Sequence, residues 1–269
     1  MKPAANIASG HDCDVHGPGM VGATPGATGV LVNGEKMSVL GDITACQAVV
    51  AEGAALVLAR GLPAVHLGHA TLHGGQVVLP LSADVLIGGP TFALPENFVV
   101  EGSPAFQNKV LRDLFFLSQT KNGREVIDRM AASGKTVTFR DYADRPPRLP
   151  PPAPQWPDTS FAVPDPLDAS PGVKNDVVIY FQPDPSVTVV WSEAGTNVST
   201  TTSPHVNLFH EMVHGMHITE GDAIPPEQVI PGHDPKNPYQ KEEARTIGDH
   251  AEGWGNEKPS ENSLRDELG

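Results

Sequence analysis

Short apolar runs closed by glycine recur over residues 20–89. Val30-Leu31-Val32 ends at Asn33-Gly34, Leu56-Val57-Leu58 ends near Gly61, and Val85-Leu86-Ile87 ends at Gly88-Gly89. Such runs favour strands, and glycine readily takes the positive φ that tight turns require. This loose internal repeat predicts an all-β stack of short strands and turns in a first domain, residues 1–95.

The spacing of apolar residues becomes helical from Ser103. Pro104 follows this capping serine, and the apolar positions that follow are Phe106, Val110, Leu114 and Leu117. A second helical stretch and three strand candidates come next, at 124–130, 136–139, 177–181 and 187–191. Helices mixed with strands predict an α+β domain over residues 96–269.

A proline-rich segment interrupts this second domain. Seven of the twelve residues from Pro146 to Pro157 are proline. Proline removes the backbone donor and fixes φ, so the segment is expected to be extended and exposed. It is either a linker or a surface excursion within residues 96–269.

A further helix is predicted from Ser203 to about Thr219. Ser203 and Pro204 suit its N-cap and first turn, and Gly221 suits its end. One apolar stripe runs along it, formed by Val206, Phe209, Val213 and Met216. Beside this stripe lie His210, Glu211, His214 and His217.

His210 and His214 stand four residues apart, so on a helix both imidazoles point the same way and can hold one zinc ion. Glu211 then faces the attacking water and is predicted to act as general base. Zinc in a peptidase takes a third protein ligand, and Glu243 in the predicted short helix 241–248 is the candidate. The alternative for the histidines is an exposed surface face. His217, seven residues after His210, is a weaker candidate ligand.

Composition and charge narrow the function classes. The chain has 27 glycines and 27 prolines, so turns are frequent, and its net charge is −14. That charge divides into −3 for residues 1–95 and −11 for the remainder. No Lys/Arg cluster suits a phosphate backbone, no apolar run is long enough to span a membrane, and the N-terminus lacks the apolar core of a signal peptide. We therefore expect no nucleic-acid ligand and no membrane span.

The histidine helix and the segment Glu242-Glu243-Ala244-Arg245-Thr246-Ile247-Gly248 together resemble the NleD-like effector peptidases and, more distantly, the clostridial neurotoxin light chains. The resemblance implies a gluzincin-like zinc metalloendopeptidase with Glu243 as third ligand and Arg245 as a scaffold residue. The alternative for Glu242 is a solvated partner of Arg245 at helical spacing.

The stretch 260–269 resembles the Glu-Asn-x-x-Arg-x-Glu-Leu-Gly stretch of NleD-like proteins, which makes Arg265 a candidate to stabilise the oxyanion. The resemblance implies an aromatic residue shortly beyond this point, whereas this sequence stops at Gly269.

Cys13 and Cys46 lie among histidines in the first domain, which suits thiolate metal ligands, with a single disulfide between them as the alternative. His11-x-Cys13, Val32-Asn33-Gly34, Gly41-Asp42, His73-Gly74-Gly75 and the closing Gly88-Gly89 resemble, in this order, the PAAR proteins that sharpen the type VI secretion spike. The resemblance implies a tapered spike tip with a structural zinc held by three histidines and one cysteine. His11, Cys46 and His73 are the first three candidates. His16 and Cys13 compete for the fourth place, and His16 fits the family's three histidines and one cysteine better. His66 or His69 could permute the set.

The two resemblances together imply an effector toxin with two zinc ions, one catalytic and one structural. It would be secreted by the type VI route on a VgrG spike trimer, without a signal peptide, and would hydrolyse a protein substrate in the target cell, in its cytoplasm. An immunity protein is expected to bind the acidic domain. The alternative is a structural spike-tip or adaptor protein whose C-terminal domain holds zinc without catalysis, and a third option is hydrolysis of an amide other than a peptide bond.

Overall fold

A computed structural model of the chain divides it into two compact units. Unit 1 comprises Met1–Pro95 and Gly102–Phe115, and unit 2 comprises Glu96–Glu101 and Phe116–Gly269. The structure describes residues 1–22, 29–78, 82, 84–146, 160–165, 172–183, 187–190, 198–201, 203–224, 241–250 and 252–269. Apart from Pro146, the predicted proline-rich segment lies outside these residues.

The Met1–Pro95 part of unit 1 is built from short strands, which confirms the expectation of a strand-rich N-terminal region. The strands are β1 (Lys2–Pro3), β2 (Gly10–Asp12), β3 (Gly19–Met20), β4 (Leu31–Val32), β5 (Glu35–Lys36), β6 (Gly53–Ala59), β7 (Leu62–Ala64), β8 (Gln76–Val78), β9 (Leu86–Ile87) and β10 (Thr91–Phe92). They form two three-stranded sheets, ordered β10-β6-β7 and β3-β2-β8, and two pairs, β1-β9 and β4-β5.

Two hairpins in unit 1 turn within two residues. Asn33 and Gly34 connect β4 to β5 with φ of 54° and 83°, and Arg60 and Gly61 connect β6 to β7 with φ of 54° and 81°. Two consecutive residues with positive φ are the mark of a type I′ turn, whose twist matches that of the flanking strands. Both glycines were expected in turns, whereas Arg60 is not a residue that sequence reasoning places there.

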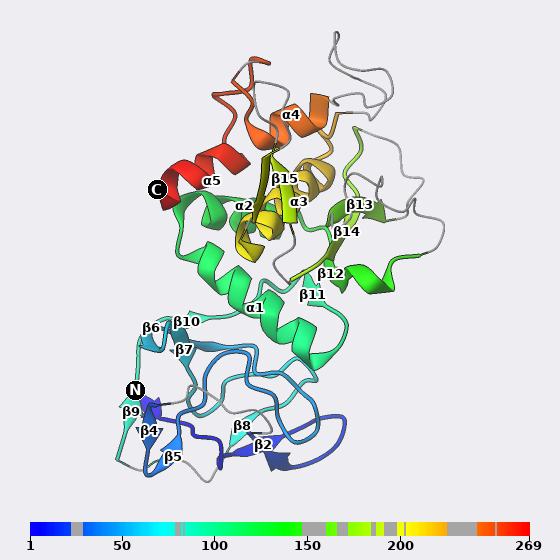
Figure 1. Cartoon of the computed structure of the whole chain (residues 1–269). Helices are drawn as coiled ribbons and strands as arrows, with labels where there is room; N and C mark the ends of the chain where they lie inside the picture. The colour runs from blue at the N-terminus through cyan, green and yellow to red at the C-terminus, as the bar shows by residue number, and fades with distance from the viewer. Residues whose placement is uncertain are drawn as a thin grey trace. The chain divides into compact units, whose positions relative to one another are not determined.

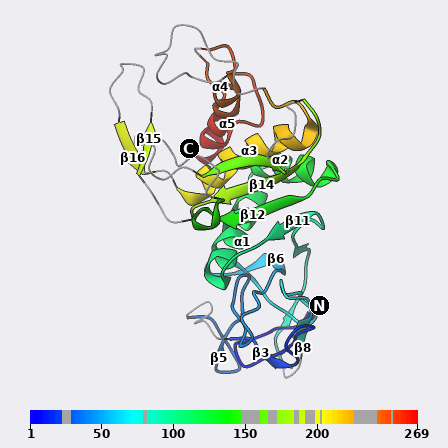
Figure 2. The ribbon, with the colours of Figure 1, turned by 90° about the vertical axis from the view of Figure 1, so that its right-hand side faces the viewer.

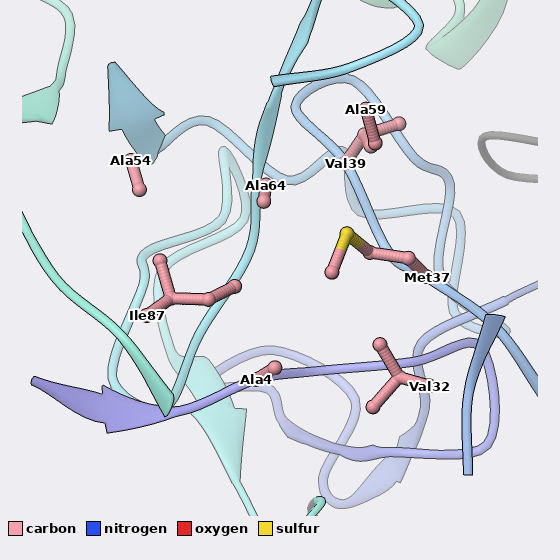
Figure 3. Close-up of a cluster of buried hydrophobic side chains, with 8 residues drawn as sticks. All are labelled: Ala4, Val32, Met37, Val39, Ala54, Ala59, Ala64 and Ile87. Carbon is pink, nitrogen blue, oxygen red and sulfur yellow. The ribbon is translucent and has the colours of Figure 1, made fainter. Parts of the chain in front are cut away.

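The main core of unit 1 is small (Figure 3). Half of its eight buried residues are alanines, and the full set is Ala4, Val32, Met37, Val39, Ala54, Ala59, Ala64 and Ile87. Burial of an alanine side chain removes little apolar area from water, so this core contributes little stability for a unit of this length. A unit of this kind gains much of its rigidity when a metal is bound.

Asp42, buried at the edge of this core, gives unit 1 a pH-dependent stability. Its Oδ2 accepts a hydrogen bond from the Val39 amide at 2.9 Å, and burial raises the pKa of its carboxyl to about 6. The pKa of the Asp42 carboxyl is higher in the folded state than in the unfolded state. Its contribution to the free energy of unfolding is therefore complete below about pH 4 and is lost as the pH rises through 6.

We therefore expect the free energy of unfolding of wild-type unit 1 to fall by up to about 3 kcal/mol between pH 4 and pH 7, because of the Asp42 carboxyl. Asp42→Asn keeps the acceptor for Val39 without the charge, so calorimetric unfolding should show a flatter pH profile. The exposed Glu35→Gln is the control. Parallel profiles for Asp42→Asn and wild type would contradict the expectation.

Unit 2 contains a four-stranded mixed sheet (Figure 2). Its strands follow the order β11 (Phe98–Val100), β12 (Val137–Asp141), β14 (Asp176–Phe181) and β13 (Phe161–Asp165). β11, β12 and β14 run parallel, and the edge strand β13 is antiparallel to β14. The strands predicted near 136–139 and 177–181 are confirmed as β12 and β14. A separate antiparallel pair joins β15 (Val187–Val190) to β16 (Val198–Thr201), and Trp191 lies outside the described residues.

The helices are α1 (Pro104–Ser118), α2 (Lys121–Ala132), α3 (Pro204–Glu220), α4 (Lys241–Ile247) and α5 (Glu261–Leu268), and the predictions for α1 to α4 are confirmed. Within unit 2, α3 packs on β14 and β13 and contacts α2, α4 and α5 (Figure 1). Gly215 permits this close packing, because a Cβ there would lie 3.0 Å from Met130 Cε and 3.4 Å from Ile179 Cδ1. The position directly after His214 is thus fixed against the sheet.

Candidate metal centres

Helix α3 positions the paired histidines. The predicted stripe of Val206, Phe209, Val213 and Met216 is buried, and the helix ends at Gly221, whose φ is 78°. Ser203 occupies the N-cap but its hydroxyl does not cap the helix and instead lies 3.0 Å from His205 Nε2. Packing of the stripe, rather than the side chain of the cap residue, therefore holds α3 in place.

Helix α4 brings Glu243 to the two histidines of α3. The Nε2 atoms of His210 and His214 lie 3.1 Å apart, and Glu243 lies 3.3 Å from the first and 3.1 Å from the second. Ligand atoms held tetrahedrally about 2.0–2.2 Å from a zinc ion lie roughly 3.3–3.5 Å apart. These three side chains therefore fit one zinc ion with a fourth position left for water.

The charges of this group complement one another. Burial lowers the pKa of His210, but the carboxylates of Glu243 and Glu261 outweigh burial and hold that pKa well above its usual value. For His214, burial is likewise outweighed by Glu242 and Glu243, which raise its pKa to about 9. Burial raises the pKa of Glu243, while the two histidines hold it well below its usual value. Positive charge is thus strongly favoured at the point where the three side chains meet.

The outer nitrogens of both histidines have acceptors. His210 Nδ1 lies 2.7 Å from Glu261 on α5, and His214 Nδ1 lies 3.2 Å from the Thr246 hydroxyl on α4. A proton on each Nδ1 leaves each Nε2 free to bind a metal. Neither Glu261 nor Thr246 was predicted in this role. The capped first turn of α5 marks Glu261 only as a helix-start residue, and nothing local in the sequence reports its contact with α3.

Glu242 is not a solvated partner of Arg245. It is buried, with Oε1 2.5 Å from His217 Nδ1 and Oε2 accepting the Ile224 amide at 2.8 Å. His217 is fully buried on this contact, and it is not part of the three-residue group. Arg245 pairs instead with Asp222 and Glu257 at 2.9 and 2.8 Å, which ties α4 to the segments after α3 and before α5.

Glu211 lies buried beside the group, 6% exposed, and accepts a backbone hydrogen bond from Ala162 on the edge strand β13. Burial raises the pKa of its carboxyl. Arg265 is 41% exposed and donates from Nε to Glu261 at 2.7 Å. It therefore acts on the site through Glu261 and His210 in this structure, and its predicted role at the oxyanion remains a prediction.

A second cluster of metal-ligand side chains occurs in unit 1. Cys13, His16, Cys46 and His73 place one ligand atom each within 4.8 Å of one another, and both cysteines are free thiols. Cys13 and His16 share one turn, with Sγ and Nδ1 3.6 Å apart. The two candidates for the fourth place therefore lie together, and His73 Nδ1 is buried without a hydrogen-bond partner.

His11 borders this cluster. The Thr71 hydroxyl donates to the Gly74 carbonyl at 2.6 Å, so it accepts from His11 Nε2 at 3.0 Å. The other ring nitrogen, Nδ1, lies within hydrogen-bond distance of Cys46 Sγ, at 3.7 Å. His11 is not part of the four-residue cluster, and its role as a ligand stays a prediction.

His66 and His69 form a separate pair in unit 1. Their rings stack with centroids 3.6 Å apart, and the His66 amide donates to His69 Nδ1 at 3.1 Å. Neither belongs to the cluster of Cys13, His16, Cys46 and His73. A permuted ligand set that includes them is therefore not favoured.

Comparison with known proteins assigns both parts of the chain. Residues 95–269 match the Peptidase_M91 family of effector proteins, and residues 10–79 match the PAAR motif. No curated protein matches the chain. None of the described helices has the length and apolar character to cross a membrane. The PAAR motif implies type VI secretion and association with a VgrG spike. The chain therefore belongs to the Peptidase_M91 effector family, as a PAAR-tipped protein with a C-terminal metallopeptidase effector domain.

Proposed function

We propose that residues 96–269 form a zincin-like zinc metalloendopeptidase that is carried on the type VI spike and hydrolyses a protein in the target cell, in its cytoplasm. The observation that carries this proposal is the meeting of His210, His214 and Glu243 from two helices, with Glu211 buried beside them. A cognate immunity protein would protect the producing cell.

The residues divide the work of peptide hydrolysis. When bound, zinc supplies Lewis-acid activation of water and of the substrate carbonyl. Glu211 takes the proton of the attacking water and passes it to the leaving amine. The Ala162 backbone holds the Glu211 carboxylate in place, and Glu261 and Thr246 hold the two imidazoles. Closing the second cluster around zinc would stiffen unit 1, whose apolar core is small.

Metal content tests the two sites separately. We expect about two zinc ions per wild-type chain, since each cluster offers enough ligands for one. Glu243→Ala should retain only the unit 1 zinc, and Cys13→Ser combined with Cys46→Ser should retain only the unit 2 zinc. Elemental analysis after dialysis gives the count. A Glu243→Ala chain that still holds both ions would contradict the catalytic site.

A further inference from the structure

The two histidines of the unit 2 site are held by different chemical groups. His210 Nδ1 faces a carboxylate, Glu261, at 2.7 Å. His214 Nδ1 faces the neutral hydroxyl of Thr246 at 3.2 Å. An imidazole that binds metal through Nε2 carries its proton on Nδ1 and needs an acceptor there. Among the described residues, Thr246 is the nearest side-chain acceptor to His214 Nδ1.

The competing acceptor for His214 is committed elsewhere. Glu242 Oε1 lies 3.5 Å from His214 Nδ1, farther than the Thr246 hydroxyl, and the same oxygen lies 2.5 Å from His217. Its other oxygen accepts the Ile224 amide. These contacts hold Glu242 toward His217 and the chain after α3. The Thr246 hydroxyl is therefore better placed to accept a hydrogen bond from His214 Nδ1–H.

The position of Thr246 suits this task. Thr246 is fully buried on α4, the helix that also carries Glu243. A helical threonine can donate its own proton to a carbonyl one turn back while its oxygen accepts a hydrogen bond. One short helix thus supplies both a metal ligand and the acceptor for a second ligand.

We propose that Thr246 is a positioning residue that fixes the Nδ1–H tautomer and ring orientation of His214, an inference that rests on the proposed metal site. A neutral hydroxyl raises the basicity of its histidine less than a carboxylate does. His210 and His214 are therefore unequal ligands, and a change in α4 alters two ligands at once.

The test compares full-length Thr246→Val, Thr246→Ser and Thr219→Val chains. Valine keeps the shape of threonine without the hydroxyl, and serine restores the hydroxyl. Thr219 is the matched control, because it is also fully buried but donates only to the Met216 carbonyl of its own helix, at 3.0 Å. Zinc affinity is measured by chelator competition, with the zinc of unit 1 as an internal reference. Proton NMR of the zinc-loaded chains follows the low-field resonance of the hydrogen-bonded His214 Nδ1–H.

We expect Thr246→Val to weaken binding of the unit 2 zinc by about 10- to 100-fold and to lose or shift the low-field resonance. Thr246→Ser and Thr219→Val should stay close to wild type. Wild-type affinity in Thr246→Val, or an equal loss in Thr219→Val, would overturn the inference. A His214→Ala chain, measured in parallel, distinguishes failure of the proposed metal site from failure of the proposed role of Thr246. If it retains as much zinc as wild type, the proposed metal site itself is wrong, whereas a zinc lost there but kept in Thr246→Val refutes only the role of Thr246.

Discussion

Glu211→Gln is expected to abolish peptide hydrolysis while leaving the fold and both metals in place. Removal of a general base costs roughly 10²- to 10⁴-fold in rate. Glutamine keeps an oxygen that can accept the hydrogen bond from Ala162, and the side chain fills the same buried space. The loss of activity should therefore appear without a loss of stability.

The measurement is the appearance of new protein N-termini in a cell lysate treated with the full-length, zinc-loaded chain, detected by mass spectrometry. Glu220→Gln is the matched control, since Glu220 ends the same helix and pairs with Arg129 at 2.5 Å. New termini should appear with wild type and Glu220→Gln and be absent with Glu211→Gln. Equal cleavage by Glu211→Gln would refute the general-base assignment. No cleavage by any chain, with both zinc ions present, would favour a structural spike-tip or adaptor protein.

The elements of unit 2 that could be predicted are those whose sequence patterns lie within one short segment of the chain. The helix that carries His210 and His214 follows from its apolar stripe and terminal glycine, all within a few turns of one another. Ser203 is its N-cap and Pro204 its first residue, as predicted, although the Ser203 hydroxyl contacts His205 and does not cap the helix. The edge strand β13 was not predicted, since Pro164 lacks a backbone donor and argues against a strand except at a sheet edge.

Contacts between distant segments explain what could not be predicted. Glu261 and Thr246 reach the histidines only because α4 and α5 both pack on α3, and no spacing rule connects them to positions 210 and 214. The resemblance singled out Arg265, which lies on α5 as Glu261 does, but the direct contact with His210 is made by Glu261. In unit 1, the resemblance favoured His16 over Cys13 for the fourth place, whereas one turn brings both to the same cluster.

The C-terminal helix α5 connects the candidate metal site of His210, His214 and Glu243 to other helices of unit 2. Its fully buried Leu264 lies on a helix that packs against α2 and α3, and Glu261 lies at its start against His210. At its far end, Glu267 accepts hydrogen bonds from the Lys121 and Asn122 amides, the first residues of α2. A carboxylate there satisfies amides that the helix itself leaves unpaired. One short helix thus links the N-terminus of α2 to His210, a proposed metal ligand.

Deletion of residues 260–269 is therefore expected to eliminate the unit 2 zinc and all cleavage, while the unit 1 zinc remains. Two point variants separate the causes. Glu261→Ala removes the acceptor for His210 together with the ion pair to Arg265, and it should weaken the unit 2 zinc by about 10- to 100-fold. Glu267→Ala removes the carboxylate that accepts from the first amides of α2, whose N-cap is Thr120, and it should cost about 1 kcal/mol of stability with zinc affinity unchanged. Zinc counts, chelator competition and thermal unfolding of the deleted chain and of the two full-length variants give these values. A deleted chain that retains two tightly bound zinc ions would show that His210 needs no support from α5, and equal zinc affinities for Glu261→Ala and Glu267→Ala would assign α5 a packing role alone.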